Sequence, residues 1–321
     1  MNKINLKKAP ICLFVYNKRH LINKILNSLS RCIGFSEHKV FIFSDNFKNY
    51  KDKKSVDKVR NTLIKFSIKN KNTSLIFRKK NFGLKKNITL GINEIILKYK
   101  RVIVLEDDLI LSKNFLLYMN SSLNFYEKNK NVFSINAYIP KLSKELLRNY
   151  SYDNVFLYNP NSWGWGTWYD RWKKFKPHFK VDKNNKKRIK KIFSLSPNEN
   201  YFSFLDINLS KKDLWFANWI YASLINKKLN CFPIISKVSN IGFDGSGQGG
   251  VSKKYETSIK KNKTTVFKFI KKVSLNEKFN LIIDNFYYQN FFLRLLKFYQ
   301  PKPIKNILKY IKKKLVSFIS T

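Results

Sequence analysis

The amino-acid sequence predicts an α/β fold in which a mostly parallel sheet is flanked by helices. Over the first 105 residues, short apolar runs alternate with segments whose apolar residues recur at helical spacing. Strands that alternate with helices form parallel pairs joined by right-handed crossovers. The chain has 321 residues, 44% of them hydrophobic and 16% aromatic, so it can form a substantial core and is neither disordered nor collagen-like.

Each element is expected from its own run of residues. The apolar runs mark strands at 11–16, 40–43, 74–77 and 102–105. Apolar residues at helical spacing mark two helices, with Leu21, Ile22, Ile25, Leu26 and Leu29 in the first and Ile88, Ile92, Ile95, Ile96 and Tyr99 in the second. Between about 150 and 250 the pattern is less regular, and two glycine-rich stretches, 162–168 and 242–250, are expected to be loops.

Polar or acidic side chains directly follow three of the expected strands. Ligands of such sheets bind beyond the carboxyl ends of the strands, so these residues are candidates for a binding site. They are Asn17, Lys18 and Arg19 after the first strand, Ser44, Asp45 and Asn46 after the second, and Glu106, Asp107 and Asp108 after the fourth.

The acidic triplet 106–108 is the strongest of these signals. Adjacent carboxylates repel one another unless a cation neutralises them, and a hard divalent ion can do so while bridging to the phosphates of a substrate. A solvated acidic turn is the alternative. Because the triplet follows a buried strand in a chain with only 20 acidic residues, the functional interpretation is favoured. Asp45 is either a hydrogen-bond acceptor for a nucleobase or ribose or an ordinary turn aspartate.

The two glycine-rich stretches are candidates for the remainder of the site. Trp163 and Trp165 offer flat faces for stacking on a sugar or closing over a nucleotide, although tryptophans also anchor cores. The stretch 242–250 contains Asp244 and five of the ten glycines, and it could form a lid. It lacks the spacing of a P-loop, which excludes a phosphate cradle of that type.

The net charge is strongly basic. Lys and Arg number 64 and Asp and Glu 20, which gives +44. Such a surface attracts polyanions, among them nucleic acid, anionic lipid and phosphorylated substrates. An AT-rich codon usage, which also enriches Asn, Ile and Phe, is the alternative origin of the excess lysine.

Cysteine and histidine usage excludes several kinds of site. The three cysteines and three histidines are scattered and form no C-x-x-C pair, so we expect no disulfide framework, zinc site or Ser-His-Asp triad. The chemistry should therefore depend on carboxylates. No apolar run reaches the ~18 residues of a membrane span, and no signal-peptide core follows the basic start, so a cytoplasmic protein is expected.

Seven stretches of the chain, in order, carry a family resemblance. They are residues 9–20 (APICLFVYNKRH), 41–48 (FIFSDNFK), 81–96 (NFGLKKNITLGINEII), 99–120 (YKRVIVLEDDLILSKNFLLYMN), 162–172 (SWGWGTWYDRW), 211–223 (KKDLWFANWIYAS) and 239–247 (SNIGFDGSG). Together they resemble a bacterial family of sugar transferases with a GT-A fold, distantly similar to the animal N-acetylglucosaminyltransferase I family.

The resemblance implies an inverting transfer of a hexosyl or N-acetylhexosaminyl group from a nucleotide-diphosphate sugar, usually with Mn²⁺ or Mg²⁺. The acceptor would be a glycan or a lipid-linked glycan. In this interpretation Asp108 matches the direct metal ligand, and Asp45 matches the aspartate that contacts the nucleobase. Residues expected to face the nucleotide sugar are Asn17, Arg19, Glu106 and Asp107.

Inversion also requires a base that removes the proton of the acceptor hydroxyl. Asp213 best matches the position expected for it, with a helix N-cap as its alternative, and Asp244 is the reserve candidate. Asp244, Trp163 and Trp165 are expected at the acceptor side. The chain departs from the family at Asn218, where relatives carry a basic residue, and at residues 247–249, where they often read G-S-G-T-H. Both departures concern the acceptor.

Residues 1–258 are expected to form the GT-A-like catalytic domain, and residues 259–321 a basic helical extension. Segments 286–299 and 304–318 combine apolar stripes with Lys and Arg, as interfacial helices do. We expect a peripheral contact with anionic lipid on the inner face of the cytoplasmic membrane, with a cap packed on the domain as the alternative. Family analogy suggests cell-surface polysaccharide or lipopolysaccharide synthesis.

Two other functions compete with this interpretation. A nucleotidyltransferase would also combine an α/β sheet with metal-binding carboxylates. A non-enzymatic nucleic-acid-binding protein would use the basic surface, but the sequence contains no recognised nucleic-acid motif and no specific nucleic-acid partner is expected.

Overall fold

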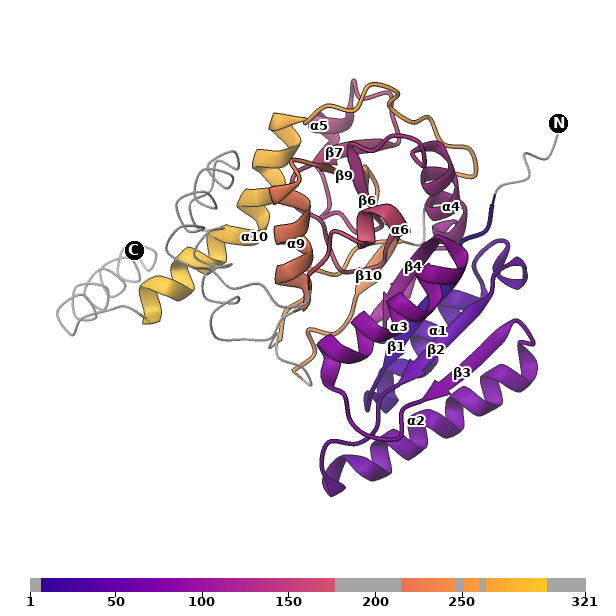
Figure 1. The fold of residues 1–321 in the computed structure, drawn as a ribbon. Helices are drawn as coiled ribbons and strands as arrows, with labels where there is room; N and C mark the ends of the chain where they lie inside the picture. Colours follow the sequence, from indigo (N-terminus) through magenta and orange to yellow (C-terminus); the bar gives the residue numbers. More distant parts are fainter. Residues whose placement is uncertain (1–6, 177–214, 246–250, 260–263, 299–321) are drawn as a thin grey trace.

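A computed structural model describes residues 7–176, 215–245, 251–259 and 264–298 (Figure 1). Its centre is an eight-stranded sheet of order β3-β2-β1-β4-β8-β6-β9-β7, and β10 and β5 form a second, two-stranded sheet. The strands are β1 (Ile11–Val15), β2 (Val40–Ser44), β3 (Thr73–Phe77), β4 (Arg101–Glu106), β5 (Leu109–Leu111), β6 (Val132–Asn136), β7 (Asn154–Leu157), β8 (Trp165–Trp168), β9 (Leu229–Pro233) and β10 (Val238–Asn240).

The helices lie on both faces of the sheet (Figure 1). They are α1 (Arg19–Ser30), α2 (Tyr50–Lys69), α3 (Gly83–Tyr99), α4 (Phe115–Phe125), α5 (Lys144–Leu147), α6 (Tyr169–Trp172), α9 (Trp215–Ile225) and α10 (Glu277–Phe298), with a 3₁₀ turn η1 (Phe35–Glu37). No helix in these described ranges is long and apolar enough to cross a membrane.

The predicted α/β class is confirmed by the strand pairing. Strands β3, β2, β1 and β4 are parallel neighbours, as are β6 and β9, while β8 runs antiparallel to both β4 and β6. Side chains of β1 alternate between the two faces. Ile11 and Leu13 join a core with α1, α2 and α4, whereas Cys12 and Phe14 join a core with α3 and α9.

Helix α2 is missing from the sequence-based expectations. It runs for 20 residues, but only Val56, Val59 and Leu63 are buried. Three buried residues form only a narrow apolar stripe along the helix. Such a stripe is hard to detect in a lysine-rich segment, because most of the helix faces solvent.

The expectation that residues 162–168 form a loop is wrong for its second half. Trp165–Trp168 form strand β8 between β4 and β6. Gly166 is needed there because a Cβ would lie 2.9 Å from the carbonyl oxygen of Val102. The glycine that suggested a loop therefore permits close strand packing.

The described part of the expected C-terminal extension packs on the sheet domain. The backbone N–H of Ile270 donates to Asn154 Oδ1 at 3.0 Å, and Tyr126 Oη donates to the Ile270 carbonyl at 2.7 Å. In α10, Phe279 and Ile283 are buried. Residues 264–287 thus pack on the sheet domain. The lipid contact and the cap were both expected of segments 286–299 and 304–318, whose side chains after residue 287 lie outside the described part of the chain, so both stay predictions, as does the boundary at 258/259.

Candidate active site at the carboxyl edge of the sheet

Strands β1, β2 and β4 end side by side. Val15 pairs with Ser44, and Phe14 pairs with Glu106, in two parallel ladders. The residues that follow each strand therefore emerge at one edge of the sheet, as the strand-end rule predicted.

Lys18 reaches from the end of β1 to the acidic triplet. Its Nζ lies 2.9 Å from Asp108 Oδ2 and 3.4 Å from Asp107 Oδ1. The backbone N–H of Tyr16 donates to the other oxygen of Asp107 at 3.1 Å. The exposed side-chain fractions of Lys18, Asp107 and Asp108 are 23%, 11% and 18%, so salt screens this cluster less than it would a surface pair.

The carboxyl groups at this edge outnumber the cations that face them. Burial, followed by repulsion from Asp108, raises the pKa of Glu106 to about 8. Burial also raises the pKa of Asp107. Burial would lower the pKa of Lys18, but Asp107 and Asp108 outweigh it and hold that pKa above its ordinary value. One ammonium therefore faces three carboxyl groups.

This imbalance fits a divalent cation that is shared with a ligand. Across the described ranges, no group of three or more His, Cys, Asp and Glu side chains is arranged to hold a metal ion on its own. Mg²⁺ is commonly held by one or two carboxylates together with substrate phosphates. Asp107 and Asp108 can supply that number of ligands, and a cation there would relieve the repulsion felt by Glu106.

Gly242 brings a third part of the chain against Asp108. Antiparallel pairing of β10 with β5 leads the chain past the triplet, and the Ile241 N–H donates to the Asp108 carbonyl at 2.8 Å. A Cβ at Gly242 would collide with Asp108 Oδ2 and lie 2.8 Å from Asp108 Cβ. Only glycine lets the loop approach this carboxylate so closely.

Asp244 is tied to the first turn of α1. Its Oδ2 lies 2.7 Å from His20 Nε2. The start of the predicted lid is therefore linked to α1 close to Lys18, and residues 246–250 lie outside the described residues.

Asp45 accepts hydrogen bonds from the backbone. It is 4% exposed and accepts from the N–H groups of Asn46, Phe82 and Gly83, each at 2.9 Å. In this arrangement Asp45 fixes the start of α3 against the end of β2. The nucleobase contact implied by the resemblance stays a prediction.

Asp52, which the sequence analysis missed, orients the end of β1. Asn17 Nδ2 donates to one of its oxygens at 3.3 Å, and Tyr16 Oη donates to the other at 2.8 Å. Asp52 lies in the first turn of α2, the helix that was not predicted, so the sequence offered no signal for it. Lys18 was noted only as a residue after a strand, and nothing local in the sequence pairs it with Asp108.

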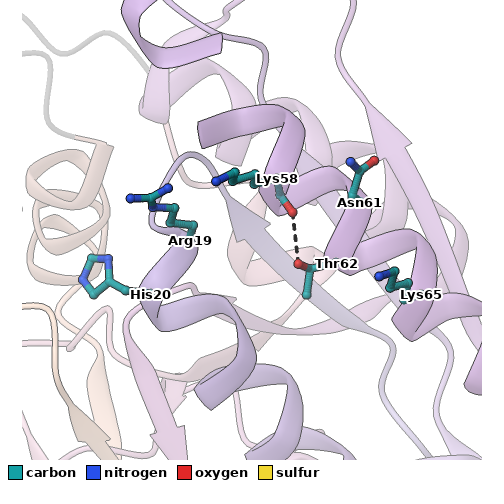
Figure 2. A pocket seen from close by; sticks show the side chains of 6 residues that line it. All are labelled: Arg19, His20, Lys58, Asn61, Thr62 and Lys65. Atoms are coloured by element: carbon teal, nitrogen blue, oxygen red, sulfur yellow. Dashed lines mark hydrogen bonds between the residues drawn. The ribbon is translucent and has the colours of Figure 1, made fainter. Parts of the chain in front are cut away.

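Arg19 begins helix α1 directly after Lys18, and the described part of the chain shows it in no ion pair with the acidic triplet. It lines a crevice between α1 and α2, together with residues of the α2 face (Figure 2). Its expected role in binding a nucleotide sugar stays a prediction.

The two tryptophans of the glycine-rich stretch have different environments. Trp165 is fully buried and its ring packs against Trp215 and Trp219, which is the environment of the core anchor that was the alternative to a place at the acceptor side. Trp163 is half-buried and contacts Phe243 of the 242–250 stretch edge to face at 5.6 Å. Of the two tryptophans, Trp163 is the one kept as a candidate for the acceptor side.

Asp213, the predicted base, lies outside the described residues. The helix expected after it is present as α9. Asn218, one departure from the family, is buried in that helix, and residues 247–249, the other departure, are not described.

No protein-family model matches the chain, and no curated protein matches it in sequence. Solved structures match at low identity. A mannosyltransferase from Pyrobaculum calidifontis in complex with GDP-mannose and Mn²⁺ is 12% identical, with a TM-score of 0.34 over 52% of this chain and 49% of that chain. GalNAc-T7 with UDP, GalNAc and Mn²⁺ is 9% identical, with a TM-score of 0.47 over 77% of this chain and 46% of that chain.

The apo structure of WbbM, a bifunctional glycosyltransferase, is 13% identical, with a TM-score of 0.34 over 70% of this chain and 38% of that chain. The chain thus spans less than half the length of each of these three proteins. At these identities and TM-scores, the matches carry no argument about what this chain binds or transfers.

Proposed function

We propose that this chain is a metal-dependent glycosyltransferase that uses a nucleotide-diphosphate sugar. One observation carries the proposal. Three stretches that resemble the sugar-transferase family, 9–20, 99–120 and 239–247, come together in space around Asp108. Lys18 contacts its carboxylate, and Gly242 packs against the same group.

The acidic edge would bind the donor. Asp108, with Asp107, would hold Mn²⁺ or Mg²⁺, and Glu106 would face the nucleotide sugar behind them. A cation bound there supplies charge that stabilises the departing diphosphate. Lys18, freed from Asp108 by the cation, would have an ammonium available for the phosphates. Asp52 would keep Asn17 oriented at the same edge.

The acceptor side is proposed on the family resemblance. Inversion requires a base, for which Asp213 remains the candidate, while Trp163 would offer an aromatic face to a glycan. Asp244 stays the reserve base, and its contact with His20 makes that role dependent on movement of the loop. A lipid-linked acceptor at the inner face of the cytoplasmic membrane, within cell-surface polysaccharide synthesis, completes the proposal.

A thermal-shift screen tests the donor half. Nucleoside diphosphates and their sugars are added to the full chain with and without Mn²⁺. A ligand at 100 times its Kd stabilises the folded state by about 2.7 kcal/mol, which is a readily measured rise in Tm. We expect a rise that needs Mn²⁺ and that disappears in Asp108→Asn.

Asp57→Asn is the matched control, because Asp57 is a half-exposed carboxylate whose 2.8 Å contact is with Lys53. It should keep the rise in Tm. A rise that survives in Asp108→Asn would remove Asp108 from the site. Release of pyrophosphate instead of a free nucleoside diphosphate would identify a nucleotidyltransferase, and binding of DNA or RNA without any nucleotide shift would favour the nucleic-acid alternative.

A further inference from the structure

A crevice of about 490 Å³ lies between the start of α1 and the middle of α2 (Figure 2). It is lined by Arg19, His20, Lys58, Asn61, Thr62 and Lys65. Lys58, Thr62 and Lys65 recur at helical spacing, so one face of α2 forms a wall of the crevice. The crevice is open to solvent, and its charged side chains are exposed.

The lining contains cations and no carboxylate. Among the contacts of the described residues, Arg19, Lys58 and Lys65 form no ion pair. Three positive charges thus line one hollow without an ion pair of their own, and the carboxylate of Asp244 reaches the lining only through His20 in the described contacts. Their mutual repulsion favours an anion between them.

The acidic residues of α2 are directed elsewhere. Asp52 accepts hydrogen bonds from Tyr16 and Asn17 at the end of β1, and Asp57 pairs with Lys53 on its own helix at 2.8 Å. The partners of Asp52 and Asp57 in these contacts all lie outside the lining of the crevice. The crevice is therefore positively charged for two reasons: the chain has an excess of lysine, and the two carboxylates of α2 pair with residues outside the crevice.

We propose that this crevice binds a phosphate group that carries two negative charges. The guanidinium of Arg19 can donate two parallel hydrogen bonds to phosphate oxygens, and Lys58 and Lys65 can each act as a point charge. Asn61 and Thr62 add neutral polar groups to the same wall. The phosphate would belong either to a soluble compound or to a lipid head group. Lys58 and Lys65 are not among the residues proposed for glycosyl transfer, whereas Arg19 is also expected at the donor side and His20 contacts Asp244. The proposal is therefore tested through the two lysines.

Binding of two probes to the full chain tests the proposal, without divalent cation and at physiological ionic strength. Inorganic pyrophosphate, measured by calorimetry, represents a soluble source. Phosphatidylcholine vesicles with and without phosphatidic acid, measured by flotation, represent a lipid source. We expect Lys58→Gln/Lys65→Gln to weaken binding of at least one probe roughly tenfold or more, because each cation lost near an anion costs about a factor of five.

Lys98→Gln/Lys128→Gln is the matched control, since both lysines are exposed and outside the crevice and the change in net charge is the same. It should alter binding by less than about twofold, and Lys58→Arg/Lys65→Arg should retain binding, because charge near the anion is what matters. Loss of only pyrophosphate or only vesicle binding supports the site and identifies the source. Three outcomes would each overturn the proposal. They are an equal loss of binding in Lys58→Gln/Lys65→Gln and Lys98→Gln/Lys128→Gln, unchanged binding in Lys58→Gln/Lys65→Gln, and no binding of either probe by the unmodified chain.

Discussion

Gly91 lies in the middle of helix α3, where alanine would ordinarily be the better residue. In an isolated helix the replacement of glycine by alanine is worth about 1 kcal/mol in favour of the helix. The structure predicts the opposite sign. A Cβ at Gly91 would lie 2.6 Å from Cε1 and 2.9 Å from Cζ of Phe14, and 3.1 Å from Cε1 of Phe43.

The two rings have little room to move away. Phe14 and Phe43 are buried and stack on each other, with centroids 5.0 Å apart. Forcing an extra carbon into a filled core costs typically 1–3 kcal/mol. After the gain in helix propensity is subtracted, we expect Gly91→Ala to lower the free energy of unfolding by up to about 2 kcal/mol.

Urea unfolding followed by far-UV circular dichroism measures this difference at constant m-value. Phe14→Leu should relieve the collision, so Gly91→Ala should be less costly in that background by about 1 kcal/mol. An increase in the unfolding free energy of the single variant, Gly91→Ala, would show that α3 does not pack on these rings as described.

Three further predictions concern single side chains. Burial lowers the pKa of Lys237 to about 8, so the unfolded chain binds the lysine proton more tightly than the folded chain does. Lys237→Met should therefore stabilise the fold by up to about 3 kcal/mol at pH 7 and by about 1 kcal/mol less at pH 9. Equal gains at both pH values in urea titrations would contradict this. Asp45→Ala should cost about 3 kcal/mol in the same assay, since three backbone N–H groups lose their acceptor, and a loss under about 1 kcal/mol would argue against the capping role. Lys18→Met should tighten the binding of Mn²⁺ in the absence of nucleotide by about tenfold, because the acidic triplet loses the ammonium group that faces it. Electron paramagnetic resonance measures this Kd. An unchanged Kd would show that Lys18 and the metal ion do not compete.

The sequence predicted those elements whose signal is local. Strands β1 to β4 and helices α1 and α3 follow from apolar runs and helical spacing within each segment. Strand β8 could not be predicted in this way, because a Trp-Gly-Thr-Trp run becomes a strand only when β4 and β6 lie on either side of it. Helix α2 was missed because three buried residues are too few to define a face.

In the candidate site, too, the sequence predicted what depends on local pattern and missed what depends on contacts between distant segments. The strand-end rule placed Asn17 and the acidic triplet at one edge without knowledge of any contact. The contact of Lys18 with Asp108 joins residues 90 positions apart, and that of Gly242 with Asp108 depends on how β10 pairs with β5. No local pattern records such pairings, so the sequence could name the carboxylates but not the groups packed against them.

The strand order also constrains the route by which the chain can fold. During synthesis β1, β2, β3 and β4 can pair once residue 106 has left the ribosome, because all four are neighbours in the sheet. The free side of β4 then stays open until β8 is made at 165–168, and β6 and β7 are not joined until β9 is made at 229–233. Unpaired strand edges recruit other chains. A nascent chain that stalls between residues 106 and 165 therefore exposes the apolar strand β4 as a template for aggregation, and fragments that end in this interval should be insoluble where the full chain is not.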